Sequence, residues 1–364
     1  MPGKIHVATR KGLLTFAPAG KEWRLGATAF LGDPISSVLR DPRDGALYAA
    51  LNLGHFGIKL HRSEDGGATW KELPVPAFPT VDPPKEGEKG PSVSQIWTLA
   101  AGGTDQPGLL WAGTNPGGLF RSDDRGESWA LVESLWSEPA REKWFGGGYN
   151  EPGIHSVCVD PRDSRRLALG ISCGGVWTSD DTGATWQQGG QGLRAEYMPP
   201  NLAYDPVAQD PHRLAQCPSA PDTIWCQHHN GIFLSEDGGR NFIEIETSKP
   251  SRFGFAVAVH PRDAKTAWFV PAVKDERRVP VDQRFVVSRT RDAGKTFQIL
   301  DSGLPSGPSF DLVYRHGLAV NDTGERLVMG STTGNLWVSD TGGDSWSPIS
   351  SHLPPVSQVA WALG

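Results

Sequence analysis

One eight-residue pattern recurs six times along this chain and constrains its fold more than any other feature. In its best copies it reads Ser/Thr-x-Asp-x-Gly-x-Ser/Thr-Trp/Phe. The copies occupy residues 63–70, 122–129, 179–186, 235–242, 290–297 and 339–346, so that successive copies begin 49 to 59 residues apart. A supersecondary unit that recurs at this spacing is typical of propellers and solenoids. The period suits a four-stranded blade with generous loops.

Each copy of the pattern predicts a tight turn between two strands. The short Asp side chain can accept backbone N–H groups of its own turn, and the Gly permits a positive φ. The aromatic residue then begins the returning strand and packs inward. Two copies depart from the pattern, because Asn241 replaces the Ser/Thr and Thr341 occupies the Asp position beside Asp340. We expect these two turns to be looser, with Asp340 as a substitute in the second.

Strand-like segments precede every copy in the same order, and the two chain ends complete the set. Six copies predict six blades, and a seventh is predicted from three segments near the start and one near the end, at residues 5–9, 12–16, 23–25 and 356–361. We therefore predict an all-β fold, a seven-bladed β-propeller of four-stranded antiparallel blades. The C-terminal strand pairs with the N-terminal blade and so removes two exposed strand edges. We expect residues 1–364 to form this one domain.

Composition excludes several classes of partner. The net charge of −6 offers no basic face for nucleic acid. No apolar run approaches 18 residues, and the first residues lack a leader pattern, so we expect a cytoplasmic protein without a membrane partner. The four cysteines form no C-x-x-C pair and lie in apolar runs, which predicts buried reduced thiols at Cys158, Cys173, Cys217 and Cys226.

A functional site is expected on the face of the propeller that is opposite the repeated turns. On that face, the equivalent position at the start of each innermost strand is occupied by Gln358, Ser36, Gln95, His155, His212, Phe255 and His316. Three of these residues are histidines, and His229 lies in a loop on the same face. Imidazoles that converge on a channel are the ligands expected for zinc, copper, iron or manganese. We predict a divalent metal bound by His155, His212, His229 and His316, with hydrogen-bonded structural histidines as the alternative.

The octapeptide resembles the Asp-box, or bacterial neuraminidase (BNR) repeat. The whole chain is similar to bacterial proteins with WD40/YVTN/BNR-like repeats, which are often labelled exo-α-sialidases or glycosyl hydrolases. The segments that carry this likeness are residues 192–197, residues 275–280, and His229 with Gly231. The resemblance implies a small-molecule site on the loop face. A true sialidase is disfavoured, because the Arg-Ile-Pro motif of sialidases is absent and seven blades are predicted where sialidases have six.

The leading functional prediction is an enzyme that acts on a small polar or anionic substrate at the channel mouth. The metal would activate water or a substrate oxygen, so the reaction would be hydrolytic, or oxidative if the metal is redox-active. Proton transfer is assigned to Glu196, Tyr197 and Glu151. Substrate binding is assigned to Arg194, Arg277, Arg278 and His55.

Two alternatives use the same face differently. A metal-free glycoside hydrolase, sialidase-like or xyloglucanase-like, would act on a glycan through paired carboxylates drawn from Glu151, Glu196 and Asp275. A non-catalytic scaffold or assembly factor would instead bind a protein partner through exposed aromatic anchors, namely Trp136, Trp144 and Tyr149.

Overall fold

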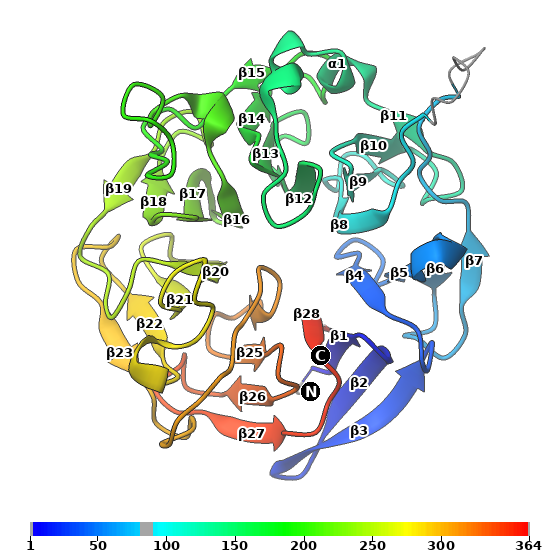
Figure 1. The fold of residues 1–364 in the computed structure, drawn as a ribbon. Helices are drawn as coiled ribbons and strands as arrows, with labels where there is room; N and C mark the ends of the chain where they lie inside the picture. Colours follow the sequence, from blue (N-terminus) through cyan, green and yellow to red (C-terminus); the bar gives the residue numbers. More distant parts are fainter. Residues whose placement is uncertain (1–2, 81–89, 363–364) are drawn as a thin grey trace.

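The computed structural model describes residues 3–80 and 90–362, so Met1 and Pro2 of the N-terminal stretch lie outside the described residues. Seven four-stranded antiparallel sheets form a ring around a central channel (Figure 1). This confirms the predicted fold class. Within the described residues, no helix combines the length and apolar character needed to cross a membrane.

Each blade runs from an innermost strand beside the channel to an outermost strand at the rim. The first contains, in that order, β28 (Val356–Trp361), β1 (Ile5–Thr9), β2 (Gly12–Ala19) and β3 (Glu22–Ala29). The second contains β4 (Ile35–Arg40), β5 (Leu47–Asn52), β6 (Ile58–Ser63) and β7 (Lys71–Leu73). The third contains β8 (Gln95–Ala101), β9 (Leu110–Asn115), β10 (Leu119–Ser122) and β11 (Ala130–Leu131). The fourth contains β12 (Gly153–Val159), β13 (Leu167–Ser172), β14 (Gly175–Ser179) and β15 (Gln187–Gln188).

The remaining blades follow in chain order. The fifth contains β16 (Pro211–Cys217), β17 (Ala220–His228), β18 (Ile232–Ser235) and β19 (Ile243–Ile245). The sixth contains β20 (Gly254–Val259), β21 (Ala267–Pro271), β22 (Val287–Thr290) and β23 (Gln298–Leu300). The seventh contains β24 (Leu318–Val320), β25 (Leu327–Gly330), β26 (Leu336–Ser339) and β27 (Ser347–Ser350). Short helices lie in the connections: η1 (Gly54–Phe56), α1 (Glu133–Trp136), η2 (Pro139–Lys143), η3 (Pro206–Ala208) and η4 (Val281–Gln283).

The two ends of the chain close the ring, as predicted. Strand β28 pairs antiparallel with β1, with Trp361 opposite Ile5 and Val359 opposite Val7 (Figure 1). Val356 and Val359 are buried in one apolar cluster with Ile5 and Val7. This pairing gives the first blade its innermost strand, so that it has four strands like the others.

The repeated turns have the predicted chemistry, and one of the two that were expected to be looser is so. Asp65 accepts the backbone N–H groups of Ala68 and Thr69, each at 2.9 Å. The looser turn predicted at Asn241 is wrong, because its side-chain amide donates to Asp237 at 2.6 Å, as short as the bond from Thr69 to Asp65. The Thr341 hydroxyl accepts the N–H of Ser345 at 2.9 Å, but its contacts with the hydroxyls of Ser339 and Ser345 lengthen to 3.3 and 3.1 Å, so this turn is looser as predicted. Asp340 does not substitute for the missing carboxylate, since it pairs with Arg326.

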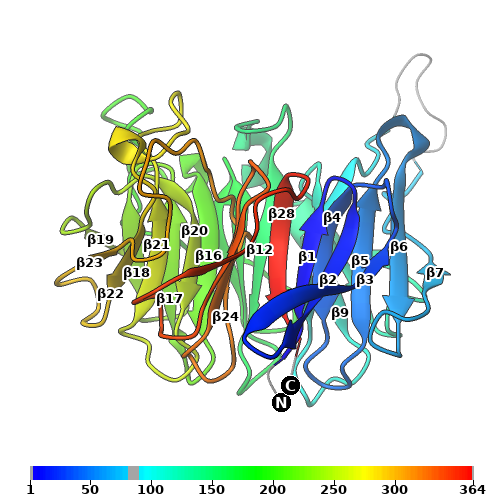
Figure 2. The same ribbon diagram turned by 90° about the horizontal axis from the view of Figure 1, so that it is seen from below.

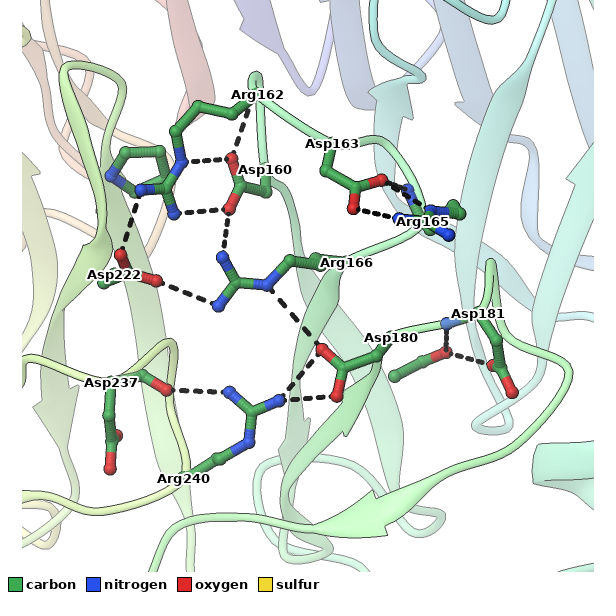
Figure 3. A network of polar contacts seen from close by, with 12 residues as sticks. Asp160, Arg162, Asp163, Arg165, Arg166, Asp180, Asp181, Asp222, Asp237 and Arg240 are labelled. Atoms are coloured by element: carbon green, nitrogen blue, oxygen red, sulfur yellow. Dashed lines mark hydrogen bonds and ion pairs between the residues drawn. The ribbon is translucent and has the colours of Figure 1, made fainter.

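Ion pairs join neighbouring blades on the face that carries these turns (Figure 3). Asp160, in the turn after β12, is 2% exposed and accepts hydrogen bonds from Arg162 and Arg166 at 2.7 and 2.8 Å. Arg166 also reaches Asp222 of the fifth blade at 2.9 Å. The charges of this face therefore connect the fourth and fifth blades to each other.

The opposite face carries the longer loops and is available for a site. Figure 2 shows these loops rising from one side of the ring, while both termini lie at the other. Residues from the later parts of β8, β12, β16 and β20, with β24, line a cavity of about 350 Å³ in the part of the channel nearer the repeated turns. All four cysteines are free and buried, as predicted.

Candidate functional site

Three polar side chains meet at the top of the fifth blade, where the innermost strand begins. Asp210 directly precedes β16, His212 is its second residue, and His229 directly follows β17. The backbone N–H of His229 donates to the carbonyl oxygen of Asp210 at 3.0 Å. This pairing places Asp210 and His229 at the same height beside the channel.

The Asp210 carboxylate divides its two oxygens between two sets of neighbours. Its Oδ1 accepts hydrogen bonds from the Ser172 hydroxyl at 3.0 Å and from the backbone N–H of Cys173 at 3.2 Å. Its Oδ2 faces His229 Nδ1 at 3.3 Å and His212 Nε2 at 3.5 Å. One ligand atom from each of these three side chains lies within 4.8 Å of the others. The fourth blade thus orients the carboxylate, and the fifth blade supplies the two imidazoles.

The protonation of this cluster follows from its surroundings. Burial alone would raise the pKa of Asp210, but contacts from His212 and His229 hold it well below its usual range, so the carboxylate is ionised. His212 donates Nδ1–H to the Gly254 carbonyl at 2.7 Å, and its ring stacks on Phe255 with centroids 4.3 Å apart. Burial lowers the pKa of His212, although Asp210 opposes this effect.

A guanidinium group lies over the same part of the channel mouth. Arg315 extends over the rings of Trp97 and Phe255, with its central carbon 4.9 and 5.4 Å from their centroids. Among the described residues, no side chain or carbonyl forms a hydrogen bond or an ion pair with Arg315, and its Nε is buried. Burial lowers the pKa of Arg315, and the negative charge of Asp210 opposes that shift. Arg315 therefore has capacity to bind an anionic group.

Two exposed tyrosines flank this mouth. Tyr149 is 45% exposed and packs edge-on against Trp97, with its hydroxyl 3.2 Å from Gln95 Oε1. Tyr197 is 40% exposed and packs edge-on against His229 at 5.0 Å. Flat aromatic faces beside polar groups suit the ring of a sugar or a similar amphipathic molecule.

The structure brings together only two of the four histidines predicted to bind metal. His155 lies 2.7 Å from the Pro211 carbonyl through Nε2 and 2.9 Å from the Ser156 hydroxyl through Nδ1. His316 donates Nε2–H to the carbonyl of His155 at 2.9 Å. Burial, helped by nearby arginines, lowers the pKa of both rings well below the usual value. His155 thus contacts a backbone carbonyl of the adjacent fifth blade, and His316 of the seventh blade contacts one of the non-adjacent fourth blade. Both contacts correspond to the structural alternative, whereas His212 and His229 share a carboxylate.

The predicted proton-transfer and substrate residues of the 192–197 segment pair mainly with protein groups. Arg194 donates to both carboxylate oxygens of Glu244 at 3.0 and 2.9 Å and pairs with Glu196 at 2.7 Å. Because Glu244 and Glu196 occupy the guanidinium of Arg194, this residue serves to position those neighbouring side chains. Tyr197 donates its hydroxyl to the Ala208 carbonyl at 2.7 Å, and burial raises the pKa of this phenol. Tyr197 therefore contributes its ring to the mouth but stays protonated at neutral pH.

The remaining predicted residues are dispersed over the loop face. Glu151 and Arg277 are exposed, and His55 stacks on Phe56 at a centroid distance of 3.9 Å. Arg278 lies 5.2 Å from the Phe255 ring while pairing with Asp275 at 2.6 Å. In the part of the chain that the structure describes, no hydrogen bond or close contact joins any two of Glu151, Glu196 and Asp275. Because the two carboxyl groups of a glycosidase lie about 5–9.5 Å apart and do not touch, a pairing among these three residues stays a prediction.

Of the aromatic anchors expected of a scaffold, one is buried and a second is partly covered. Trp144 is 7% exposed and packs against Trp177. Trp136 lies under the guanidinium of Arg141, whose central carbon is 3.3 Å from the ring centroid. Only Tyr149 presents an open ring, so these residues do not form a broad docking patch.

Asp210 and Arg315 were missed in the sequence, although each had a local signal. Asp210 and His212 are two residues apart at the start of a strand, and this spacing puts both side chains on the same side. Arg315 directly precedes a histidine that was aligned with the mouth position. Comparing one equivalent position per blade does not take account of the residues next to that position.

No protein-family model matches this chain. Among curated proteins, it is 36% identical over 96 residues to the xyloglucanase Xgh74A of Acetivibrio thermocellus, which is 25% of this chain and 10% of the relative. It is 24% identical over 333 residues to an oligoxyloglucan-reducing end-specific xyloglucanase of Emericella nidulans, covering 88% of this chain and 34% of the relative. The chain therefore spans about a third or less of the length of these relatives.

Similar solved structures include proteins of different kinds. A GH74 xyloglucanase from Xanthomonas campestris aligns over 96% of this chain and 53% of its own, with a TM-score of 0.65 and 19% identity. YCF48 from Cyanidioschyzon merolae aligns over 93% of this chain and 89% of its own, with a TM-score of 0.55 and 13% identity. At these identities the likeness establishes the propeller fold and leaves the activity to be argued from the site.

Proposed function

We propose that this protein is a carbohydrate hydrolase of the glycoside hydrolase type, acting at the channel mouth on a sugar that carries an anionic group. The observation that carries the proposal is an ionised, buried Asp210 in contact with His229, beside the open guanidinium of Arg315. A water-activating pair and an anion-binding group thus lie at one mouth. The names of the two curated relatives support a glycan as the substrate class.

Asp210 and His229 would activate the attacking water. Without a bound cation, His229 donates Nδ1–H to Asp210 Oδ2 at 3.3 Å, which leaves Nε2 on the far side of the ring as the base. The His229 side chain is 22% exposed while that of Asp210 is 6% exposed, so His229 is the member that reaches solvent. The buried carboxylate orients the imidazole and stabilises its positive charge after proton transfer. The water oxygen would bond to the attacked carbon as the bond to the leaving oxygen breaks, and the leaving oxygen would take up a proton from solvent.

Arg315 and Arg278 would hold the anionic group of the substrate. Both guanidinium groups lie over the Phe255 ring, at 5.4 and 5.2 Å. Arg278 is partly neutralised by Asp275, whereas Arg315 has its N–H groups available. Charge-assisted hydrogen bonds from Arg315 to a carboxylate or phosphate would orient the sugar between Tyr149 and Tyr197.

A glycine-rich loop limits access to the cluster. Gly147 lies so close that an added Cβ would be 2.6 Å from Cys173 Sγ and 3.7 Å from Asp210 Oδ2. The backbone of this loop therefore covers one side of the carboxylate. Excluding bulk water in this way strengthens the electrostatic interactions of the enclosed groups.

A sugar lactone or ester is a second candidate substrate, favoured by the histidine–carboxylate pair. Glycosidases ordinarily use two carboxyl groups about 5–9.5 Å apart, whereas the side chains that face Oδ2 of Asp210 are two imidazoles. Attack of an activated water on a carbonyl carbon requires only a base of the kind that His229 supplies.

The test is hydrolysis of a substrate panel by the purified chain. The panel contains neutral xyloglucan oligosaccharides, uronic-acid glycosides, sugar lactones and sugar esters. We expect turnover of an acid-bearing member, with a loss of at least about 100-fold in kcat/KM for Asp210→Asn. Asp44→Asn is the matched control, because Asp44 pairs with Arg125 away from the mouth. Equal turnover by Asp210→Asn and the native protein, or no turnover of any member, would refute the proposal.

A further inference from the structure

The contact between His212 and Asp210 is electrostatically incomplete. The Nδ1 of His212 must carry a proton, because it lies 2.7 Å from the Gly254 carbonyl, which can only accept. In the neutral ring, Nε2 therefore carries no proton and presents a lone pair. That lone pair faces Oδ2 of the Asp210 carboxylate at 3.5 Å. Two acceptors that face one another in a buried place require a cation or a proton between them.

The distances fit a metal ion better than they fit hydrogen bonds. A charge-assisted N–H to carboxylate bond is about 2.7–2.9 Å long, whereas Asp210 Oδ2 is 3.3 and 3.5 Å from the two imidazole nitrogens. Ligand atoms placed about 2.0–2.1 Å from a tetrahedral zinc ion are about 3.3–3.4 Å apart. Both histidine–carboxylate distances thus match edges of a tetrahedral coordination shell.

The surrounding groups also orient the three ligands as metal sites require. The Gly254 carbonyl fixes the tautomer of His212 and directs Nε2 toward the cluster. Ser172 and the Cys173 N–H hold Oδ1, which leaves Oδ2 for coordination. The backbone bond between His229 and Asp210 holds the third ligand beside the first two.

We propose that Asp210, His212 and His229 bind one divalent transition-metal ion of the zinc class. Two imidazoles and one carboxylate form a three-ligand set that leaves further positions for water or substrate. The half-buried His229 forms the solvent-facing side of this site. The set differs from the predicted four histidines in replacing His155 and His316 with a carboxylate.

The catalytic role of this ion rests on the proposed function. A water molecule bound to the metal would take the place of the water activated by His229. Arg315 would remain the group that binds the substrate anion. The positive charges of Arg315 and the metal ion would together offset the negative charges of Asp210 and the substrate anion. The metal site itself is defined by the three ligands and is testable without any substrate.

The experiment measures metal uptake by protein freed of tags and of metal by chelator dialysis. Isothermal titration with zinc chloride should show one equivalent bound. Titration with cobalt(II) should give the visible absorption of a tetrahedral ion. Asp210→Asn, His212→Ala and His229→Ala should each weaken binding at least about 100-fold. His352→Ala, which removes an exposed histidine outside the cluster, should bind like the native chain.

Circular dichroism establishes that each variant is folded, and the partly exposed position of His229 makes His229→Ala the decisive variant. Absence of saturable zinc and cobalt binding would overturn the inference. Unchanged binding by Asp210→Asn and His229→Ala would overturn it equally. Metal binding without hydrolysis would leave this inference standing and refute the proposed function. Hydrolysis that persists in excess chelator would support only the proposed function.

Discussion

Replacing Arg315 by methionine separates a functional from a structural role for this guanidinium. Arg315 packs on Trp97 and Phe255 but has no hydrogen-bonding partner among the described residues. A charge-assisted hydrogen bond to a substrate anion contributes about 1.5–3 kcal/mol. Because about 1.4 kcal/mol corresponds to a factor of ten in affinity, Arg315→Met should weaken binding of an acid-bearing sugar about 10- to 150-fold.

The same substitution should hardly alter the free energy of unfolding. It removes cation–π contacts of about 0.5–2 kcal/mol and also removes the cost of burying an unpaired Nε, about 1–3 kcal/mol. These contributions have opposite signs, so we expect a change in Tm below about 4 °C.

The assay combines titration calorimetry, with glucuronic acid and glucose as ligands, and thermal unfolding of each variant. Arg326→Met is the matched control, since Arg326 lies over Trp23 and Trp361 at 5.4 and 5.0 Å, away from the mouth. It should leave the preference for the acid unchanged. A large fall in Tm for Arg315→Met with an unaltered preference for the acid would show that the residue is structural and refute the reasoning.

Four further predictions concern packing, pH and the loop. Arg166→Met should lower the free energy of unfolding by about 1–3 kcal/mol, because it removes one partner of the buried Asp160; an unchanged denaturation midpoint would contradict this. Burial would raise the pKa of Asp160, but Arg162 and Arg166 hold it below its usual value. Its contribution to stability is therefore complete above about pH 5 and is lost as pH falls through the folded-state pKa, so Asp160→Asn should flatten acid unfolding curves. Gly147→Val should displace the loop from Cys173 and reduce turnover while preserving Tm, and normal turnover would show that the loop is not close to the site. Burial raises the pKa of Cys158 to about 11; a thiol reagent should modify none of the four buried cysteines rapidly in the native protein and all four in denaturant.

The blades could be predicted from the sequence because they depend on local chemistry that repeats. Each turn combines Asp, Gly and an aromatic residue at fixed offsets, and β28 matches the innermost strands of other blades. The looser turn predicted at Asn241 was wrong because an Asn amide can make the same bond as the hydroxyl that it replaces. A consensus pattern does not reveal such equivalence.

The site was only partly predictable because it depends on contacts between blades. The interaction of His155 with Pro211 depends on how the fourth and fifth blades are staggered, and that of His316 with His155 joins the seventh blade to the non-adjacent fourth. No local pattern encodes either relation. The position of His229 beside Asp210 depends likewise on the register of β16 and β17. Sequence therefore identified the face and two of the three residues of the cluster, and the carboxylate between them required the fold.

The central claim places the substrate at the mouth formed by Asp210, His229 and Arg315. It is tested most directly by a crystal structure of Asp210→Asn soaked with the acid-bearing substrate that the native protein hydrolyses best. We predict the acidic group within hydrogen-bonding distance of Arg315, with the scissile bond beside His229 and the sugar ring against Tyr149 or Tyr197. A substrate bound on the opposite face, or on the loop face but out of reach of Arg315 and His229, would contradict the account.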